Sequence, residues 1–472
     1  MANTIVDDGS FQPVTDELAS RDPLGFPQYM DALAQAGREP LDAGPARISG
    51  HPVELAVFDF SIMGGSMGEV VGERLARAFD RATERDVPIV LMIRTGGARM
   101  QEGMVSLVQM PKVVSARIDA ALAHVPFVVV LGDPTTGGVL ASAGNLADVT
   151  LAVEGATIGF AGPRVVHRFT GEPLPPGAHS STFALKHGLI DSVVSRSEIR
   201  TVLTNVLDVL APDEIDAVDE PAAATTVPSP DPWTALQAVR ARGRPRPPQL
   251  AGDVADASID LRGDRGGTED PALVCRLARI AGRRALVMAT DPDHSPGPGA
   301  FRKARRALAV AARLELPVVN LIDTRGADPS LEAEQQGIAA EIASTFEAML
   351  RTPVPILSIV TGEGGSGGAL AFATGDLLFA YSDSIFTVID VEAAAEILWR
   401  DVARAPEAAR LLKIGAHDLL ELGIADGLIP GPPEARSLKR VIAYHLARLV
   451  TEDVGATRTA TRRRRWRTIG ST

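Results

Sequence analysis

Apolar runs alternate with amphipathic segments along most of this chain. Residues 89–93 and 126–131 are almost continuously apolar, a pattern typical of strands that are covered on both faces. Residues 66–85 place apolar side chains at helical spacing between such runs, and the runs at 317–322 and 354–360 repeat the strand pattern later in the chain. Strand, helix and strand in this order predict an α/β fold, with mostly parallel sheets covered by helices.

The same pattern occurs twice at a constant separation. Pro126 and Pro355 precede equivalent apolar runs, and 355 minus 126 is 229. Ile93-Arg-Thr-Gly-Gly-Ala98 matches Ile322-Asp-Thr-Arg-Gly-Ala327 at the same separation of 229 (322 minus 93). The sequence therefore predicts two diverged copies of one fold.

A glycine turn follows an apolar run in each copy, within residues 131–142 and 361–370. Glycines at a predicted helix start leave backbone N–H groups accessible, and such groups suit an oxyanion. For a single copy, close helix–strand packing would explain the glycines equally well, but two copies in register favour a function. Two loops in each copy are expected to supply donors: Gly97 and Ala98 with Gly137 and Gly138, and Gly326 and Ala327 with Gly367 and Gly368.

Composition narrows the class of protein. The 472 residues, 45% hydrophobic and 22% charged, suit a globular chain of two to three domains. No apolar run approaches the roughly 18 residues of a membrane-spanning helix, and residues 1–20 do not resemble a signal peptide. The single Cys275 allows neither an intrachain disulfide nor a cysteine-based zinc site, which indicates a reducing cytoplasm. A net charge of −12 argues against nucleic-acid binding, and no membrane association is expected.

Composition also suggests where the domains end. Residues 1–20 are expected to be disordered, and the Ala-, Pro- and Thr-rich residues 211–232 to form a linker. The two copies are then assigned to residues 21–210 and 233–450. The arginine-rich residues 451–472 are interpreted as a basic, solvated and disordered tail; a segment that docks on an acidic partner is the alternative.

Several motifs resemble the carboxyltransferase of bacterial acetyl-CoA carboxylase. Four in the first copy are similar to its β subunit: Met63-Gly-Gly-Ser-Met-Gly68, Gly96-Gly-Ala-Arg-Met-Gln-Glu-Gly103, Asp133-Pro-Thr-Thr-Gly-Gly-Val139 and Ile158-Gly-Phe-Ala-Gly-Pro-Arg164. Four in the second copy are similar to its α subunit: Phe301-Arg-Lys-Ala304, Ile322-Asp-Thr324, Gly362-Glu-Gly-Gly-Ser-Gly-Gly-Ala-Leu370 and Ile397-Leu-Trp399. The chain thus resembles a β–α fusion, which implies two tandem crotonase-like (ClpP/crotonase) domains.

The resemblance implies transfer of a carboxyl group from carboxybiotin to acetyl-CoA, giving malonyl-CoA for fatty acid biosynthesis. The biotin would be carried by a partner, the biotin carboxyl carrier protein, and would not be attached to this chain. A biotin carboxylase would complete the ATP-dependent complex, and the chain would form a homo-oligomer of two or more copies. Residues 21–210 would bind the acyl-CoA and residues 233–450 the biotin.

The resemblance also assigns site residues. Gly137 and Gly138 would hold the thioester enolate oxygen, and Gly368 and Ala369 the ureido oxygen of biotin. Six further residues would line the substrates: Gly97, Ala98, Arg99, Gly326, Ala327 and Gly367. No metal site is expected. Arg99, Lys112 and Arg164 are candidate contacts of the CoA phosphates.

The sequence departs from the family pattern in three places. The β subunit usually carries a four-cysteine zinc ribbon before its first motif, and this chain has none. The α subunit typically reads Asp-Thr-Pro-Gly-Ala-Tyr-Pro-Gly and Ile-Ser-Pro-Glu-Gly, where this chain has Asp323-Thr-Arg-Gly-Ala-Asp-Pro-Ser330 and Ile389-Asp-Val-Glu-Ala393. Because a charged pair beside a neutral ring is costly unless its charges satisfy each other, Arg325 and Asp328 are expected to form a local ion pair.

Three alternatives remain open at this point. Propionyl-CoA or another acyl-CoA could replace acetyl-CoA as the acceptor. Ser142, His167 and Asp191 occur in the order that a serine peptidase on the same fold would need, although a triad is defined by geometry. The altered residues Arg325, Asp328 and Asp390 also leave room for a non-catalytic scaffold of a carboxylase complex.

Overall fold

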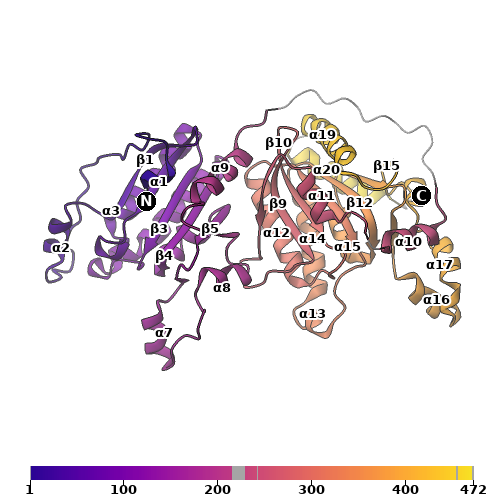
Figure 1. Ribbon diagram of the computed structural model, residues 1–472, viewed down its shortest axis with the longest axis horizontal. Helices are drawn as coiled ribbons and strands as arrows, with labels where there is room; N and C mark the ends of the chain where they lie inside the picture. The colour runs from indigo at the N-terminus through magenta and orange to yellow at the C-terminus, as the bar shows by residue number, and fades with distance from the viewer. Residues whose placement is uncertain (1, 215–228, 242, 453–454, 470–472) are drawn as a thin grey trace. The chain divides into compact units, whose positions relative to one another are not determined.

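The predicted strand at residues 89–93 lies at the centre of the first of two sheets, each in its own structural unit (Figure 1). The computed structural model describes residues 2–214, 229–241, 243–452 and 455–469. The first unit comprises residues 1–210 with 265–267, and the second comprises 211–264 with 268–472. Most of the predicted linker, residues 215–228, lies outside the described residues.

The first unit contains a sheet in the order β1-β2-β3-β4-β5-β7, with β6 paired to β4. Its strands are β1 Leu41–Ile48, β2 His51–Phe58, β3 Ile89–Thr95, β4 Phe127–Thr136, β5 Val149–Val153, β6 Ile158–Gly159 and β7 Ser192–Val194. Its helices are α1 Ala2–Ile5, α2 Tyr29–Ala36, α3 Glu69–Arg85, α4 Met104–Leu107, α5 Gln109–Leu122, α6 Gly137–Leu140, α7 Pro163–Thr170, α8 Ser181–Lys186 and α9 Ile199–Leu210. The β1–β2 hairpin is antiparallel, and the strands from β2 to β7 are parallel.

The second unit repeats this plan in the order β15-β13-β12-β11-β10-β9-β8, with β14 paired to β12. Its strands are β8 Ala257–Leu261, β9 Leu273–Ile280, β10 Arg283–Thr290, β11 Val318–Thr324, β12 Ile356–Gly365, β13 Leu377–Tyr381, β14 Ile385–Thr387 and β15 Gly427–Ile429. Its helices are α10 Pro232–Arg240, α11 Pro247–Asp253, α12 Pro298–Arg313, α13 Leu331–Gln335, α14 Ile338–Arg351, α15 Ser366–Ala373, α16 Val391–Trp399, α17 Ala405–Leu411, α18 Ala416–Glu421, α19 Ala435–Thr451 and α20 Ala456–Thr468. Apolar side chains of α11 and α19 pack on one face of the central strands.

The predicted repeat is visible in the strand boundaries. Strand β11 begins at position 318 and β3 at position 89, and strand β12 begins at position 356 and β4 at position 127. Both pairs therefore keep the separation found in the sequence, since 318 minus 89 and 356 minus 127 are each 229. The central strands and the parallel order agree with the sequence pattern. The sequence did not predict that β4 and β12 continue through the glycine-rich turns, because those residues lack the apolar side chains that mark a strand.

The prediction that residues 1–20 are disordered is wrong. Ile5 and Val6 are buried, and the backbone N–H groups of Gln12 and Val14 donate to the carbonyl groups of Pro45 and Ala43 on β1, each at 2.9 Å. Backbone pairing along the edge of a sheet needs few apolar side chains. The polar composition of residues 1–20 therefore did not indicate that they are ordered.

The prediction of a solvated, disordered C-terminal tail is also wrong. Residues 456–468 form the helix α20, and Arg458 and Arg462 on it are buried. The Arg462 guanidinium donates to Asp376 at 2.7 and 2.8 Å and to the carbonyl groups of Met349, Thr352 and Val354. An arginine run looks solvated in sequence because its partners lie far away along the chain.

A loop from the middle of the chain completes the first unit. Residues 265–267 belong to that unit, although the residues on either side belong to the second. The Arg265 guanidinium lies 2.5 Å from the carboxylate of Asp191, which is fully buried. The main segment of the first unit ends at residue 210, where the first domain was predicted to end, but the unit also contains residues 265–267, which were assigned to the second domain.

Candidate functional site

The first glycine turn joins the end of β4 to α6 and touches the loop after β3. Gly97 and Gly137 have φ angles of 111° and 72°, which side chains disfavour. A Cβ atom on Gly97 would lie 3.0 Å from Gly137 Cα and 3.3 Å from the backbone nitrogen of Gly138. The two loops therefore meet backbone against backbone.

Not every amide in this turn is available to a ligand. The Gly137 N–H donates to the Phe160 carbonyl at 2.9 Å, and the Gly97 N–H donates to Thr95 Oγ1 at 3.0 Å. Within the described ranges, the N–H groups of Ala98 and Gly138 have no acceptor. A Cβ atom on Gly138 would lie 3.7 Å from Ala98 Cβ, so these two residues are neighbours. This pair can donate to one oxygen atom.

The backbone of the second glycine turn, which lies in the second unit, resembles that of the first turn. Helix α15 begins at position 366 and α6 at position 137, and 366 minus 137 is again 229. Ser366 therefore corresponds to Gly137, and its φ of 56° resembles the 72° of Gly137 although it is not a glycine. Gly367 then corresponds to Gly138, whereas the predicted Gly368 and Ala369 lie one and two residues further on.

The donors of the second turn follow from this correspondence. The Gly326 N–H donates to Thr324 Oγ1 at 3.3 Å, but the N–H groups of Ala327, Gly367 and Gly368 have no acceptor in the part of the chain that the structure describes. A methyl group on Gly368 would clash with the Ala327 nitrogen, so these loops also touch. Ala369 is buried and is the fourth residue of α15, where a helix normally uses the N–H itself.

An apolar cavity of about 270 Å³ lies beside this second turn. Its walls come from Ser366, Gly367, Leu370, Leu378, Phe386, Thr387, Val388, Leu412, Lys413, Leu419, Leu422 and Ile424. A compact ring that is mostly apolar and carries one oxygen acceptor would fit such a surface next to free N–H groups.

Three basic residues were candidates for contacts with the CoA phosphates, and two of them are already paired with carboxylates of the protein. Arg99 is fully buried, and its guanidinium donates to Glu39 at 2.7 Å, to Tyr29 Oη at 3.1 Å and to Glu102 at 3.2 Å. Arg99 therefore holds its own loop and does not face a substrate. Lys112 lies 3.2 Å from Glu73, and Arg164 lies on α7 with its side chain outside the described part.

The three residues of the rival peptidase triad have separate surroundings. Ser142 Oγ is buried and donates to the Gly138 carbonyl at 2.7 Å, within its own turn. The Asp191 carboxylate accepts from Arg265 and from the backbone N–H of Thr150, while His167 is exposed on α7. The described contacts do not assemble a triad.

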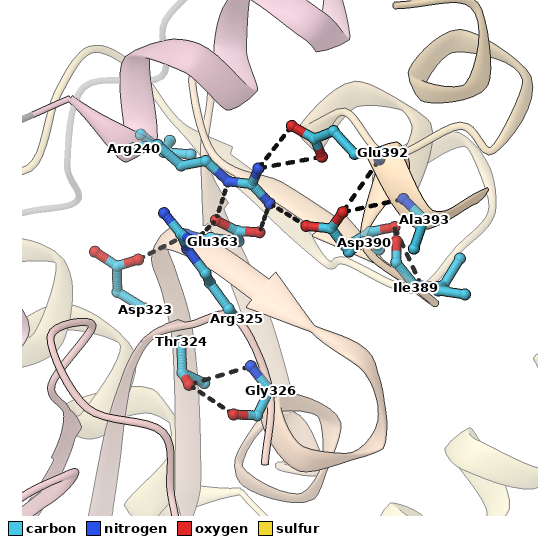
Figure 2. A network of polar contacts seen from close by, with 12 residues as sticks. Arg240, Asp323, Thr324, Arg325, Gly326, Glu363, Ile389, Asp390, Glu392 and Ala393 are labelled. Atoms are coloured by element: carbon cyan, nitrogen blue, oxygen red, sulfur yellow. Dashed lines mark hydrogen bonds and ion pairs between the residues drawn. The ribbon is translucent and has the colours of Figure 1, made fainter. Parts of the chain in front are cut away.

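A network of charged residues connects the end of α10 with β12 and the start of α16 (Figure 2). Arg240, at the end of α10, donates to both oxygens of Glu363 on β12 and also pairs with Asp390 and Glu392. The expected ion pair between Arg325 and Asp328 is not formed. Arg325 Nε instead lies 3.8 Å from Glu363, and the Asp328 carboxylate accepts from Ser330, because the loop after β11 turns Arg325 toward β12.

Asp323, the penultimate residue of β11, borders the same network. Its carboxylate accepts the Glu363 backbone N–H at 2.9 Å and lies 3.7 Å from the Arg244 guanidinium. Burial disfavours the charged form and raises the pKa of Asp323 from 3.8 to about 6, although the hydrogen bond and Arg244 act in the opposite direction. The folded protein therefore binds a proton here at pH values where the unfolded chain has lost it.

We expect the free energy of unfolding of the wild type to depend on pH through this proton, whereas the Asp323→Asn variant cannot titrate at this position. Relative to the variant, the wild type should lose stability as the pH rises from 3.8 to about 6, and the difference should be flat above that range. The loss should total roughly 3 kcal/mol. Urea unfolding of both proteins at one-unit pH intervals measures it; a constant difference across this range would contradict the assignment.

Comparisons with known proteins identify the family. Residues 208–470 match the family model described as acetyl co-enzyme A carboxylase carboxyltransferase-like. The acetyl-coenzyme A carboxylase carboxyl transferase subunits beta/alpha of Salinispora arenicola are 39% identical, over 99% of this chain and 89% of theirs. This chain belongs to the acetyl-CoA carboxylase carboxyltransferase family.

Other relatives of the carboxyltransferase agree with this assignment. A probable biotin-dependent acyl-coenzyme A carboxylase beta3 subunit of Mycobacterium bovis is 35% identical, over 100% of this chain and 98% of its own length. The solved transcarboxylase 12S matches with a TM-score of 0.78 at 22% identity, over 96% of this chain and 89% of that chain. The prediction of a β–α fusion with crotonase-like folds is confirmed. No helix among the described residues is long and apolar enough to cross a membrane.

Sequence reasoning located both turns of the carboxyltransferase but missed part of their surroundings. Counting from the strand starts, rather than from the glycines, would have aligned Gly367 with Gly138. The network around Arg240 joins residues 123 to 152 positions apart, so their spacing carried no signal. The acidic residues Asp323 and Glu363 near the carboxyl ends of β11 and β12 were a usable sign, because the carboxyl ends of parallel strands meet at one edge.

Proposed function

We propose that this carboxyltransferase transfers the carboxyl group of carboxybiotin, held on a carrier protein, to acetyl-CoA to give malonyl-CoA. The observation that carries the proposal is the pair of matching turns, each with adjacent backbone N–H groups that have no acceptor among the described residues. The reaction needs donors for two oxygen atoms, one on the thioester and one on the ureido ring. The names of relatives with up to 39% identity support acetyl-CoA as the acceptor.

In the first unit, we assign the thioester oxygen to the N–H groups of Ala98 and Gly138. Negative charge develops on that oxygen as the neighbouring carbon loses its proton, and donors that are already in place stabilise it. Each such hydrogen bond contributes on the order of 3 kcal/mol in the transition state. Gly97 and Gly137 have a supporting role, since their N–H groups are used within the protein and their lack of side chains lets the loops meet.

In the second unit, we assign the ureido oxygen of biotin to the N–H groups of Ala327, Gly367 and Gly368. Bound biotin would supply the carboxyl group as a labile N-carboxylate. The apolar cavity beside Gly367 would cover the ring, and the turn would orient the ureido edge. Gly368 thus keeps its role as a donor to the ureido oxygen, which the resemblance gave it. Gly367 takes this role in place of Ala369.

The proposal includes partners. A biotin carboxyl carrier protein would deliver the biotin, and a biotin carboxylase would recharge it with ATP in the cytoplasm. We also infer that the chain forms a homo-oligomer of at least two copies. The solved transcarboxylase 12S, which shares the fold, is described as a hexamer assembly, and this supports the inference.

The reaction run in reverse tests the proposal directly. Purified protein given malonyl-CoA and biocytin, a free biotin derivative, should form acetyl-CoA, and without biocytin it should form none. Liquid chromatography of the CoA esters measures both. Decarboxylation at the same rate without biocytin would contradict the transferase assignment, and no turnover with an active carrier protein present would favour the scaffold alternative.

The same assay decides the acyl group. Methylmalonyl-CoA offered in parallel should react more slowly than malonyl-CoA if acetyl-CoA is the natural acceptor. The reverse preference would assign the chain to propionyl-CoA. The transcarboxylase 12S structure has methylmalonyl-coenzyme A bound, so this comparison separates two members of one fold.

A further inference from the structure

Arg240 is in contact with three carboxylates that lie far apart in the sequence. Its Nε and Nη2 atoms donate to the two oxygens of Glu363 at 2.9 and 2.7 Å, a bidentate arrangement. Its Nη2 also donates to Asp390 at 2.9 Å and its Nη1 to Glu392 at 3.1 Å. Figure 2 shows the guanidinium between Glu363 on one side and Asp390 and Glu392 on the other.

Two of these carboxylates are built into the elements that border the apolar cavity. Glu363 precedes Ser366 by three residues on the strand that leads into the second turn, and Ser366 lines the cavity. Asp390 caps the N-terminus of α16 by accepting from the N–H groups of Glu392 and Ala393, and it follows Val388, another wall residue, by two positions. Arg240 therefore ties the strand that leads into the second turn and the start of α16, each next to a wall residue of the cavity, to a single side chain.

Burial makes this connection stiff. The Glu363 side chain is 5% exposed and that of Arg240 is 18% exposed, so neither charge is well solvated. Apolar side chains of α10 pack with those of α16 and α17 in one cluster, which fixes the end of α10 that carries Arg240. Removal of one partner from such a buried pair leaves an uncompensated charge, so the network resists displacement of its members.

The first unit shows that the fold does not require this network. The positions of the first unit that correspond to Asp323 and Glu363 under the repeat are Arg94 and Pro134. Arg94 Nε donates to the Asp133 carbonyl at 2.8 Å, so the first unit closes the same strand ends with one arginine and a backbone oxygen. Carboxylates at these two positions are thus present in the second unit and not in the first, and the apolar cavity of about 270 Å³ lies in the second unit.

We propose that Arg240 is a positioning residue that sets the distance between the second glycine turn and the start of α16, and so the width of the cavity. Asp390 and Arg325, where the chain departs from its family, belong to this arrangement: Asp390 adds a carboxylate to Arg240, and Arg325 approaches Glu363 from the loop after β11. The inference rests on the proposed function, which places biotin in this cavity.

The test compares Arg240→Met with Arg410→Met in the reverse reaction. Arg410 on α17 pairs with Asp231 at 2.8 Å, is 58% exposed and lies in the same group of helices, so it is a matched control. We expect Arg240→Met to raise the KM for biocytin about tenfold while the KM for malonyl-CoA stays within twofold. Arg410→Met should change neither KM. Arg240→Lys keeps the positive charge but cannot donate to both carboxylate oxygens as a guanidinium does, so its KM for biocytin should lie between those of the wild type and Arg240→Met.

Hydrogen exchange gives a readout that does not depend on turnover. The amides of residues 391–394 should exchange faster in Arg240→Met than in the wild type, while those of the first unit stay unchanged. The inference would be overturned if Arg240→Met changed the KM for both substrates equally. It would also be overturned if Arg240→Lys and Arg240→Met were folded and both behaved as the wild type. Absence of biotin-dependent turnover in the wild type would instead contradict the proposed function, and the exchange data would still decide whether Arg240 holds α16.

Discussion

Replacement of Gly138 by valine should lower the rate of the biotin-dependent reaction at least about 100-fold. The new Cβ atom would lie 2.9 Å from Met110 Sδ and 3.7 Å from Ala98 Cβ, beside the two N–H groups to which we assign the thioester oxygen under the proposed function. Met110 is long and flexible, so it can move and the turn can keep its fold. The valine methyl groups would then occupy the space that the oxygen needs.

The control for this variant is Ala141→Val. Ala141 is exposed at the end of the same short helix, and the change adds the same kind of bulk at a position open to solvent. Steady-state kinetics with malonyl-CoA and biocytin measures both variants, and thermal unfolding checks that each is folded. Near-normal turnover of a folded Gly138→Val protein would remove this turn from the active site.

Replacement of Arg462 by methionine should destabilise the second unit by about 3–5 kcal/mol. Arg462 is fully buried and makes hydrogen bonds to both oxygens of Asp376 and to three backbone carbonyl groups. Methionine fills a similar volume but leaves the buried Asp376 carboxylate with one charged partner fewer. It also leaves carbonyl oxygens at the end of α14 and in the loop before β12 without this donor.

The neighbouring Arg463 provides a matched control, because it is exposed on the outer face of α20. Arg463→Met should change the free energy of unfolding by less than about 0.5 kcal/mol. Urea unfolding followed by tryptophan fluorescence suits the measurement, since Trp466 on α20 donates to the Gly375 carbonyl at 3.1 Å. Similar losses in both variants would mean that the helix contributes through general charge and not through the Arg462 contacts.

The parts that the sequence predicted well are those in which local pattern and tertiary environment agree. The apolar runs at residues 89–93 and 318–322 had to be central strands, since only a position between two helical layers covers both faces. The constant separation between the two copies located both turns from the sequence alone. The glycines at 97 and 137 lie where the two loops meet, with φ angles of 111° and 72° that favour glycine, but the sequence could not show that the Gly137 N–H donates to the Phe160 carbonyl.

The parts that the sequence did not predict depend on pairing between distant polar groups. Residues 12–14 pair through backbone atoms with β1, and Arg462 pairs with Asp376 at a separation of 86 residues. Arg99, a candidate substrate contact, pairs with Glu39, 60 residues away. A charged side chain looks the same in sequence whether it meets water, a substrate or a buried carboxylate, and the choice is made by the fold.

The loop of residues 265–267 has a consequence for how this chain could be divided. A cut within residues 211–232 would seem to separate two independent proteins. The first fragment would then lack Arg265, and the buried Asp191 would lose its guanidinium partner at 2.5 Å. Two separately expressed fragments would thus be unequal, because the earlier one depends on a loop supplied by the later one. The order of the chain and the division of the fold therefore do not coincide, and a working split would have to carry residues 265–267 with the first fragment.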